Sequence, residues 1–407
     1  MADALCSECI EDRFLREIVC AEGVAARCDV CDQDRPHTIT IDRLGELLEP
    51  EIRKHYRQGN QSPPDWDQEG DDLDFVVQEA LGQYFDFNDQ IIDAVIAAEY
   101  CDPRDGDIPF FERGTNYVAI PATGSDLQFR WASVQNELST TRRFFSSAAE
   151  AFFDELFQDV DGILSTHGIR DDRGVVADIP VGFTVYRGRI CEGDLLEIFR
   201  DPYKEVGPPP LKFARAGRMN ADGISIFYGA TDKETCLAEL RPAIHQESAV
   251  ITLQTTKSLR MLDFTRMETA YKSLSYFQPD FDYQDEKLSF LRILGTLISR
   301  PVVPGHEADY LITQTMMEYL AHVYRDPIER KSFDGVIFKS AQRETGKNIV
   351  LFPQMERDLP TFPLEYVAES LTIHKTKTIT YNHKETKYRF DGEAVQMEWD
   401  DVWDSFE

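Results

Sequence analysis

Four cysteines near the start of the chain have the spacing of metal ligands. Cys6 and Cys9 form one Cys-x2-Cys pair, and Cys28 and Cys31 form a second pair after eighteen intervening residues. Each pair supplies two thiolates from one tight turn, and two such turns complete a tetrahedron around one ion. Four protein ligands leave no position for water, so the spacing predicts a structural Zn²⁺ site. The alternative is a set of buried free thiols.

A second group of residues suits an anionic ligand. Arg215 and Arg218 lie close to Gly217, in a stretch that begins at Lys212, and Arg187 comes at the end of an earlier expected strand. Guanidinium groups bind phosphate oxygens in a bidentate manner, and glycine lets a backbone approach closely. The residues therefore predict a phosphate or pyrophosphate site, in a chain whose formal net charge is −30.

A tyrosine and a glutamate follow the arginines at the spacing of a strand and a helix. Tyr228 ends the next expected strand, and its ring can stack on a flat ligand. Glu239 lies on a helix that we expect to begin near Thr231 or Asp232. A carboxylate near several arginines stays ionised and can face a developing positive charge. Each residue alone is better explained as an ordinary surface or half-buried side chain; their order as a set indicates a site.

Composition limits the class of protein. The chain has 407 residues, of which 42% are hydrophobic, so we expect a globular protein of two or three domains. It has no apolar run of about 18 residues and no basic or apolar start, so neither a membrane helix nor a secretory signal is expected. We therefore expect a cytoplasmic protein with reduced cysteines. The acidic charge argues against nucleic-acid binding, which depends on Lys and Arg contacts to phosphate.

Hydrophobic periodicity indicates how these residues are positioned. Helical spacing is expected at 40–57, 73–99 and 127–160. The last of these should bury one apolar face, made by Phe144, Phe145, Phe152, Phe153, Leu156 and Phe157. From about residue 180 the pattern changes to short β-rich segments, at 183–190, 225–230, 249–255 and 335–340. Alternation near the C-terminus predicts a β-hairpin through Ile373, Ile379, Tyr381, Tyr388 and Phe390.

These patterns predict an α+β fold in four parts, with a linker near 166–180. Residues 1–37 would form the four-cysteine zinc knuckle and residues 38–170 a helical N-terminal domain. Residues 180–355 would form a mixed α/β catalytic domain, and residues 356–407 the β-hairpin and an acidic tail.

Three segments of the chain together resemble the RES domain family. They read VYRGRI, GRMNADGISIFYGATDKETCLAEL and SFDGVIFKSAQRETGKNIVLF. The residues that match the family pattern, in order, are Arg187, Arg218, Asn220, Gly223, Tyr228, Glu239, Ser340, Asn348, Leu351 and Phe352. Each motif alone is weak, but the ordered set is specific, and it covers about residues 180–355. Phe338 stands where the family often has Tyr, and the stretch 266–310 is longer than in compact members.

The N-terminal region more loosely resembles a module that precedes RES or HEPN domains in some bacterial proteins. The HEPN ribonuclease signature is an Arg and a His a few residues apart on one helix. Arg300 and His306 have this spacing, but two prolines and a glycine between them exclude a continuous helix. We therefore expect no HEPN active site.

The resemblance to RES domains implies an ADP-ribosyltransferase-like fold that uses NAD⁺ as substrate and breaks its nicotinamide–ribose bond. Arg187 and Arg218, with Asn220 in the cofactor-binding set, would hold the pyrophosphate, and Tyr228 would shape the nicotinamide pocket. Glu239 would oppose the oxocarbenium-like charge, and Ser340 would bind the nicotinamide end or the acceptor. No catalytic metal is implied.

The resemblance also implies a biological role, as a toxin of a toxin–antitoxin pair or an anti-phage effector. An antitoxin or regulatory partner and a homo-oligomer are left open, as is the acceptor: water, phosphate or a macromolecule. The alternatives are an ADP-ribosyltransferase acting on a macromolecule and a sensor that binds a nucleotide without cleaving it. We expect the N-terminal region either to sense a signal or to hold the catalytic domain in an inactive state.

Overall fold

The computed structural model describes most of the chain. The described residues are 3–62, 67–101, 104, 107–166, 172–211, 214–299, 310–357, 359–379, 388–390 and 395–397. Lys212, the Arg300–His306 pair, part of the expected linker and the acidic tail lie outside these residues. Among the described helices, none is long and apolar enough to cross a membrane.

The first described residues form a small antiparallel sheet beside a helix. The strands β1 (Ala4–Cys6), β3 (Gln33–Thr40) and β2 (Val24–Cys28) lie in that order, and α1 (Arg13–Glu22) packs against β3. Asp12 caps α1, because its carboxylate accepts a hydrogen bond from the Leu15 amide at 2.7 Å. This sheet brings the two cysteine pairs together.

A group of helices and short strands follows the first sheet. Its elements are α2 (Ile41–His55), β4 (Tyr56–Gln58), β5 (Gln61–Ser62), β6 (Asp67–Gln68), β7 (Asp71–Asp72), α3 (Leu73–Leu81), α4 (Asn88–Ala98) and β8 (Asn116–Ala119). The helix expected at 40–57 is confirmed as α2, which Thr40 caps by accepting from the Arg43 amide at 3.1 Å. The helical character expected over 73–99 is confirmed, but it is divided into two helices, because Gly82 adopts a left-handed φ of 69° and ends α3.

The segment 127–160 also forms two helices, α5 (Ser125–Thr140) and α6 (Ser147–Phe157). Ser146 begins the second helix, since its hydroxyl accepts from the Ala149 amide at 3.1 Å. The expected burial of Phe144 and Phe145 is wrong: they lie between the helices and are 77% and 101% exposed. The expected burial is confirmed for Phe152, Phe153, Leu156 and Phe157.

A large sheet forms the centre of the second half of the chain. In spatial order its strands are β11 (Val176–Ile179), β15 (Leu259–Asp263), β17 (Gly335–Lys339), β18 (Lys347–Leu351), β13 (Phe227–Ala230), β12 (Thr184–Ile190), β14 (Glu247–Thr255) and β21 (Leu364–Tyr366). The strands expected at 183–190, 225–230, 249–255 and 335–340 are confirmed. Neighbours along this order are antiparallel except β15 and β17, which are parallel.

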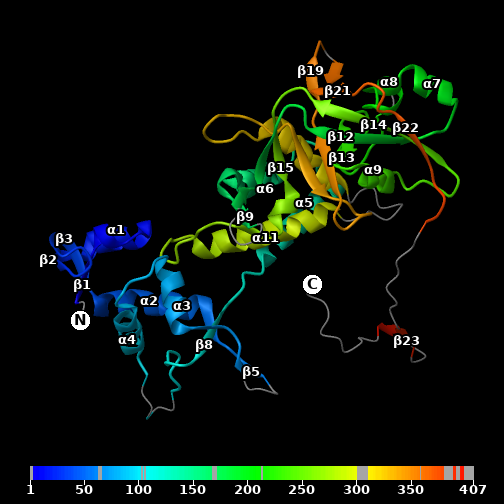
Figure 1. The fold of residues 1–407 in the computed structure, drawn as a ribbon. Coiled ribbons are helices and arrows are strands. Elements are labelled where there is room, and N and C mark those ends of the chain that lie inside the picture. Colours follow the sequence, from blue (N-terminus) through cyan, green and yellow to red (C-terminus); the bar gives the residue numbers. More distant parts are fainter. Residues whose placement is uncertain are drawn as a thin grey trace.

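Both faces of this sheet are covered. Side chains alternate along a strand, so in β17 Val336 and Phe338 join one core while Ile337 joins another. The first core also contains α5, α6, α11 (Phe281–Ser299) and α12 (Leu311–Glu318), and the second contains α7 (Leu195–Arg200) and α8 (Pro202–Val206). Figure 1 shows α11 between the N-terminal elements and the sheet. The remaining helices are α9 (Lys233–Leu240) and α10 (Phe264–Met267).

The hydrophobic cores divide the chain near residue 120. Buried residues from Leu5 to Tyr117 form one core, and those from Leu127 to Phe352 include the core on the α5, α6, α11 and α12 face. We call residues 3–119 the N-terminal unit. The predicted boundary at residue 170 stays a prediction about domains, but α5 and α6 pack with the sheet that follows it. A fragment beginning at residue 180 would therefore lack part of its own core.

The chain after residue 355 differs from the expected hairpin. Ile373 lies in β22 (Thr372–Lys375), which pairs with β14 and extends the large sheet. The prediction that Ile373 belongs to a terminal hairpin is therefore wrong, because the free edge of β14 offers its backbone a partner. A separate hairpin joins β23 (Tyr388–Phe390) to β24 (Val395–Met397). The other small sheets use β9 (Leu164–Thr166), β10 (Asp172–Gly174), β16 (Ala270–Tyr271), β19 (Gln354–Glu356) and β20 (Leu359–Thr361).

The packing of α6 predicts a sharp contrast between two phenylalanines. Replacing the fully buried Phe153 by alanine should lower the free energy of unfolding by about 3–5 kcal/mol, since it opens a cavity. Phe145→Ala is the matched control, and it should change the same quantity by less than about 0.5 kcal/mol. Chemical denaturation of the full chain measures both. Equal losses in the two variants would contradict the placement of α5 and α6.

Candidate active site and metal centre

The central strands of the large sheet set polar and aromatic residues side by side. Phe338 on β17 pairs with Asn348 on β18, which in turn pairs with Ala230 on β13. Tyr228 lies two residues before Ala230 and therefore shares its face. Residues that are far apart in the sequence thus meet on one face of the sheet.

A cavity of about 340 Å³ lies over these strands. We call it the site cavity; it is lined by Arg187, Gly188, Gly217, Arg218, Tyr228, Gly229, Ala230, Cys236, Glu239, Leu240, Tyr310, Phe338 and Asn348. Its volume is within the range of small-molecule sites, about 300–1,000 Å³. Arg187, Arg218, Tyr228 and Glu239, which the sequence indicated as a set, all line it.

Helix α9 carries Glu239 to the cavity. Asp232 caps this helix as expected, accepting from the Thr235 amide at 2.8 Å. The helix approaches β12 closely at Gly188, where a Cβ atom would lie 2.8 Å from the Leu240 side chain. A larger residue at this strand position would therefore require the Leu240 side chain to shift.

Two neighbours hold the Glu239 carboxylate by a single oxygen. The Ser340 hydroxyl donates to Oε1 at 2.5 Å, and the Asn348 amide donates to the same atom at 2.8 Å. Among the described residues no hydrogen bond reaches Oε2. One oxygen is therefore fixed to the sheet, and the other is left for a ligand in the cavity.

Ser340 acts on Glu239 and on its own turn. Its hydroxyl oxygen accepts from the backbone amides of Gln342 at 3.1 Å and Arg343 at 3.2 Å, and its proton goes to Glu239. Ser340 is buried and is not among the residues that line the site cavity. The sequence-based role of Ser340 as a direct ligand group thus has less geometric support than a role in holding Glu239.

Arg187 is a half-buried cation, and one of its donors is unused. Its Nη1 donates to the Tyr228 carbonyl at 2.6 Å, but its buried Nε has no hydrogen-bond partner among the described residues. Burial lowers the pKa of the guanidinium, which still remains charged because arginine is so strong a base. Arg187 also lines the site cavity, so its guanidinium group can contact an anionic ligand bound there.

Arg218 lies in a turn that several side chains fix. The Gln314 amide donates to the carbonyls of Gly217 at 2.7 Å and Asn220 at 3.0 Å, and the Thr313 hydroxyl donates to the Arg218 carbonyl at 2.7 Å. A Cβ atom at Gly217 would lie 2.8 Å from the Asn220 side chain, so a larger residue there would displace Asn220.

The arginine side chain itself reaches the end of α11. Nη1 of Arg218 donates to the carbonyls of Ile298 at 3.2 Å and Ser299 at 3.1 Å. Among the described residues, no carboxylate lies within ion-pair distance of Arg218 or Arg187. Both guanidinium groups can therefore bind an anion.

Two predicted residues also have structural roles in the same turn. The Asn220 amide donates to the carbonyls of Arg215 at 2.9 Å and Ile224 at 2.8 Å, and Asn220 is not part of the cavity lining. The Tyr228 hydroxyl accepts from the Met219 amide at 2.8 Å, and burial raises the pKa of this phenol. Tyr228 thus joins the turn to the sheet and also presents its ring to the cavity.

Sequence reasoning missed three contributors to the site. Asn348 belonged to the motif, but its contact with Glu239 follows only from the register of β18 against β13. Phe338 was noted only as a departure from the family pattern, yet it lines the cavity. Tyr310 also lines the cavity, and no local signal in the sequence pointed to it.

A second cavity, of about 770 Å³, is also lined by Arg187. The two cavities share this one residue among their lining residues. Besides Arg187, the charged residues that line the second cavity are of both signs: Arg189, Lys204, Arg215, Glu192, Glu205 and Asp222. Arg215, which was picked out with Arg218, therefore lies in this neighbouring cavity.

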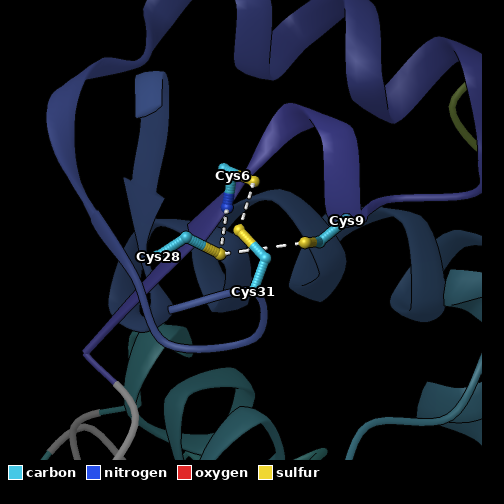
Figure 2. A group of neighbouring side chains, drawn as sticks. All are labelled: Cys6, Cys9, Cys28 and Cys31. Atoms are coloured by element: carbon cyan, nitrogen blue, oxygen red, sulfur yellow. Dashed lines mark hydrogen bonds between the residues drawn. The ribbon is translucent and has the colours of Figure 1, made fainter. Parts of the chain in front are cut away.

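The four N-terminal cysteines come together as the spacing predicts. The sulfur atoms of Cys6, Cys9, Cys28 and Cys31 all lie within 4.8 Å of one another, and none is in a disulfide. Figure 2 shows the four side chains of the two Cys-x2-Cys pairs pointing toward one another. The Sγ–Sγ distances are 3.9 Å for Cys6 and Cys31 and 3.9 Å for Cys9 and Cys28. A tetrahedral ion with Zn–S bonds of about 2.3 Å needs about 3.8 Å, so the cluster can hold a metal ion.

The surroundings of the sulfur atoms also suit thiolate ligands. The buried Cys6 amide donates to the Cys28 sulfur at 3.3 Å. A hydrogen bond from Arg35 lowers the pKa of the Cys31 thiol to about 7, while burial raises the pKa of Cys9. A bound dication would favour the deprotonated form of all four.

One family model matches this chain. Residues 189–374 match the model described as RES domain. The match supports the RES family for this part of the chain, and it includes Arg218, Tyr228, Glu239 and Ser340. It begins just after Arg187 and does not extend over the N-terminal unit. A search of curated proteins and a search of solved structures found no match.

If the cysteine cluster holds zinc, the zinc content of the protein should depend on the four clustered cysteines and not on other cysteines. Cys28→Ser should reduce bound zinc from one ion per chain to well below one, since serine is a poor ligand for this ion. Cys20→Ser is the matched control, because Cys20 is an exposed free cysteine outside the cluster. Metal analysis of protein purified without chelator measures both. A parental chain with little zinc would contradict the assignment.

Proposed function

We propose that this chain cleaves the nicotinamide–ribose bond of NAD⁺. The observation that carries the proposal is one cavity that is lined by Glu239, Arg187 and Arg218. Among the described residues, one oxygen of this carboxylate has no donor and neither arginine has an acidic partner. The RES family is associated with NAD⁺-related toxin function, and the matched part of the chain includes most of this site. An ADP-ribosyltransferase-like arrangement of the sheet is part of the same proposal.

The arginines suit the diphosphate of the dinucleotide. Arg187 lines both the site cavity and the second cavity, so it could contact a group that joins two halves of a ligand. Arg187 and Arg218 both line the site cavity, and their guanidinium groups can donate to phosphate oxygens. Such contacts would also give each cation an anionic partner, which neither has among the described residues.

The ring-bearing side chains suit the nicotinamide end. Tyr228, Tyr310 and Phe338 line the site cavity with Glu239. Aromatic walls bind a flat heterocycle by offset or edge-to-face contact. This arrangement would place the bond between nicotinamide and ribose near the carboxylate.

Glu239 would act on the charge that develops as the bond breaks. The electron pair of the nicotinamide–ribose bond leaves with nicotinamide, which departs as a neutral molecule, and the ribose carbon becomes oxocarbenium-like. The free Oε2 of Glu239 would stabilise this cation and bind a ribose hydroxyl. Water or inorganic phosphate then adds to the carbon; with water, the products are nicotinamide, ADP-ribose and a proton.

Ser340 and Asn348 would act as positioning residues. Both donate to Oε1 of Glu239, so they fix the direction of Oε2 without competing for it. This revises the role suggested by sequence alone, in which Ser340 contacted nicotinamide or the acceptor. A carboxylate fixed before the substrate arrives needs little reorganisation during the reaction.

Sustained NAD⁺ loss would harm the cell that makes the enzyme. This supports a role as a toxin or defence effector under control by another protein or by the N-terminal unit. In the N-terminal unit, the four-cysteine cluster would bind Zn²⁺ as a structural ion, away from the site cavity.

Removing the charge of Glu239 tests the proposed role. Glu239→Gln keeps the size of the side chain and should lower the rate of NAD⁺ loss by about 100-fold or more. Glu234→Gln is the control, because Glu234 is an exposed residue of the same helix and does not line the cavity. NAD⁺ consumption by the two purified full chains is measured under the same conditions. A Glu239→Gln variant with the parental rate would refute the proposal for this residue.

A further inference from the structure

Helix α11 connects the N-terminal unit with the site cavity. Its first residue, Phe281, packs against the N-terminal unit, and the carbonyl groups of its last two residues accept hydrogen bonds from Arg218. The helix has 19 residues and is therefore roughly 28 Å long. Figure 1 shows it running between the two parts of the molecule.

Aromatic contacts and hydrogen bonds join the start of α11 to the N-terminal unit. The Phe281 ring lies 4.4 Å from the His55 ring and 4.6 Å from the Tyr276 ring, measured between centroids. The Tyr276 hydroxyl lies 3.1 Å from that of Tyr56, which donates to Glu79 at 2.7 Å.

An ion pair adds to this junction. Lys54 Nζ lies 2.7 Å from an Asp282 oxygen, although both side chains are more than half exposed, so the pair contributes little to stability. A displacement of the N-terminal unit would therefore act on α11 chiefly through Phe281 and Tyr276.

The middle of α11 is tightly packed against its neighbours. Phe290, Leu291 and Leu294 are fully buried in the core shared with α5 and α6. Gly295 lies so close to α10 that a Cβ atom would be 2.9 Å from the Phe264 carbonyl oxygen. Well-packed cores transmit displacement rather than absorb it, so movement at one end of this helix reaches the other.

The far end of α11 holds a ligand-binding arginine. Carbonyl groups at a helix C-terminus carry partial negative charge and attract cations. One nitrogen of Arg218 is tied to two such carbonyls, which directs the remaining nitrogens of the guanidinium. A shift of the helix end would change the position of this guanidinium in the site cavity.

The junction at the start of α11 is not fully packed. A cavity of about 600 Å³ lies there, lined on one side by Phe14 and Glu79 and on the other by Tyr276, Phe281 and Asp285, with other residues. Space between the two parts permits relative movement, and the contacts named above are those through which that movement would act.

We propose that α11 is the element through which the N-terminal unit positions Arg218. In the arrangement described here, the contacts at Phe281 keep Arg218 directed into the site cavity and so favour an anionic ligand. Loosening the junction should therefore weaken ligand binding. The proposal rests on the proposed function for its ligand, the diphosphate of NAD⁺, but the coupling between junction and turn does not depend on catalysis.

The test compares full-length variants in two readouts. Phe281→Ala removes the ring that joins α11 to His55, and Tyr56→Phe removes only the hydroxyl contacts of the same junction. Val95→Ala is the matched control, since Val95 is fully buried in the N-terminal unit but belongs to α4. The readouts are calorimetric binding of ADP-ribose and hydrogen exchange of the amides at 217–228.

Phe281→Ala should weaken ADP-ribose binding by about fivefold or more and speed exchange at 217–228 to a similar extent. Tyr56→Phe should also weaken ADP-ribose binding and speed exchange at 217–228, but by less than Phe281→Ala does. Val95→Ala should change neither by more than about twofold. In an Arg218→Ala background, the effect of Phe281→Ala on exchange should disappear, because the connection to the helix end is already absent.

The outcomes separate this inference from the proposed function. If Phe281→Ala and Tyr56→Phe leave exchange at the parental rate, the coupling is refuted even where the parental chain cleaves NAD⁺. The coupling is also refuted if Phe281→Ala speeds exchange at 217–228 equally in the parental chain and in the Arg218→Ala background. If the parental chain binds no ADP-ribose and releases no nicotinamide, the proposed function fails, and hydrogen exchange still decides the coupling.

Discussion

The site depends on one shared hydrogen-bond acceptor, the Oε1 atom of Glu239. Ser340 comes from the turn after β17 and Asn348 from β18, so two neighbouring strands direct one carboxylate that is carried by a helix. This contact requires the close approach of α9 at Gly188, the register of β18 against β13 and β17, and the turn that Ser340 closes. A carboxylate oxygen that is turned toward a sheet is stable there only if it finds donors. Ser340 and Asn348 provide them for Oε1.

The same arrangement explains how an acidic protein can bind an anion. The formal charge of −30 is a property of the whole molecule, but recognition is local. Arg187 and Arg218 point into the cavity, and their described partners are backbone carbonyls rather than carboxylates. Carbonyl groups orient a guanidinium without neutralising it, whereas an ion pair would compete with the ligand. Local geometry therefore outweighs the overall charge.

Sequence reasoning succeeded where the signal is local or periodic. Alternating apolar residues located the strands that carry Arg187 and Tyr228, a side-chain cap marked the start of α9, and the cysteine spacing predicted the cluster. It failed where the outcome depends on a distant partner. Phe144 has an apolar side chain but lies between two helices, and Ile373 pairs with β14 because the edge of the large sheet is free there. The part played by Asn348 likewise needed the strand register, and α11 could not be connected to Arg218 without its position in space.

The most direct measurement is the release of nicotinamide from NAD⁺ by the purified full chain. If the fixed carboxylate and the two arginines form an active site, free nicotinamide should accumulate in step with the loss of NAD⁺, and ADP-ribose or its phosphate should appear in equal amount. If the chain binds NAD⁺ but releases no nicotinamide, it is a nucleotide-binding protein rather than an enzyme. That result would contradict the central claim.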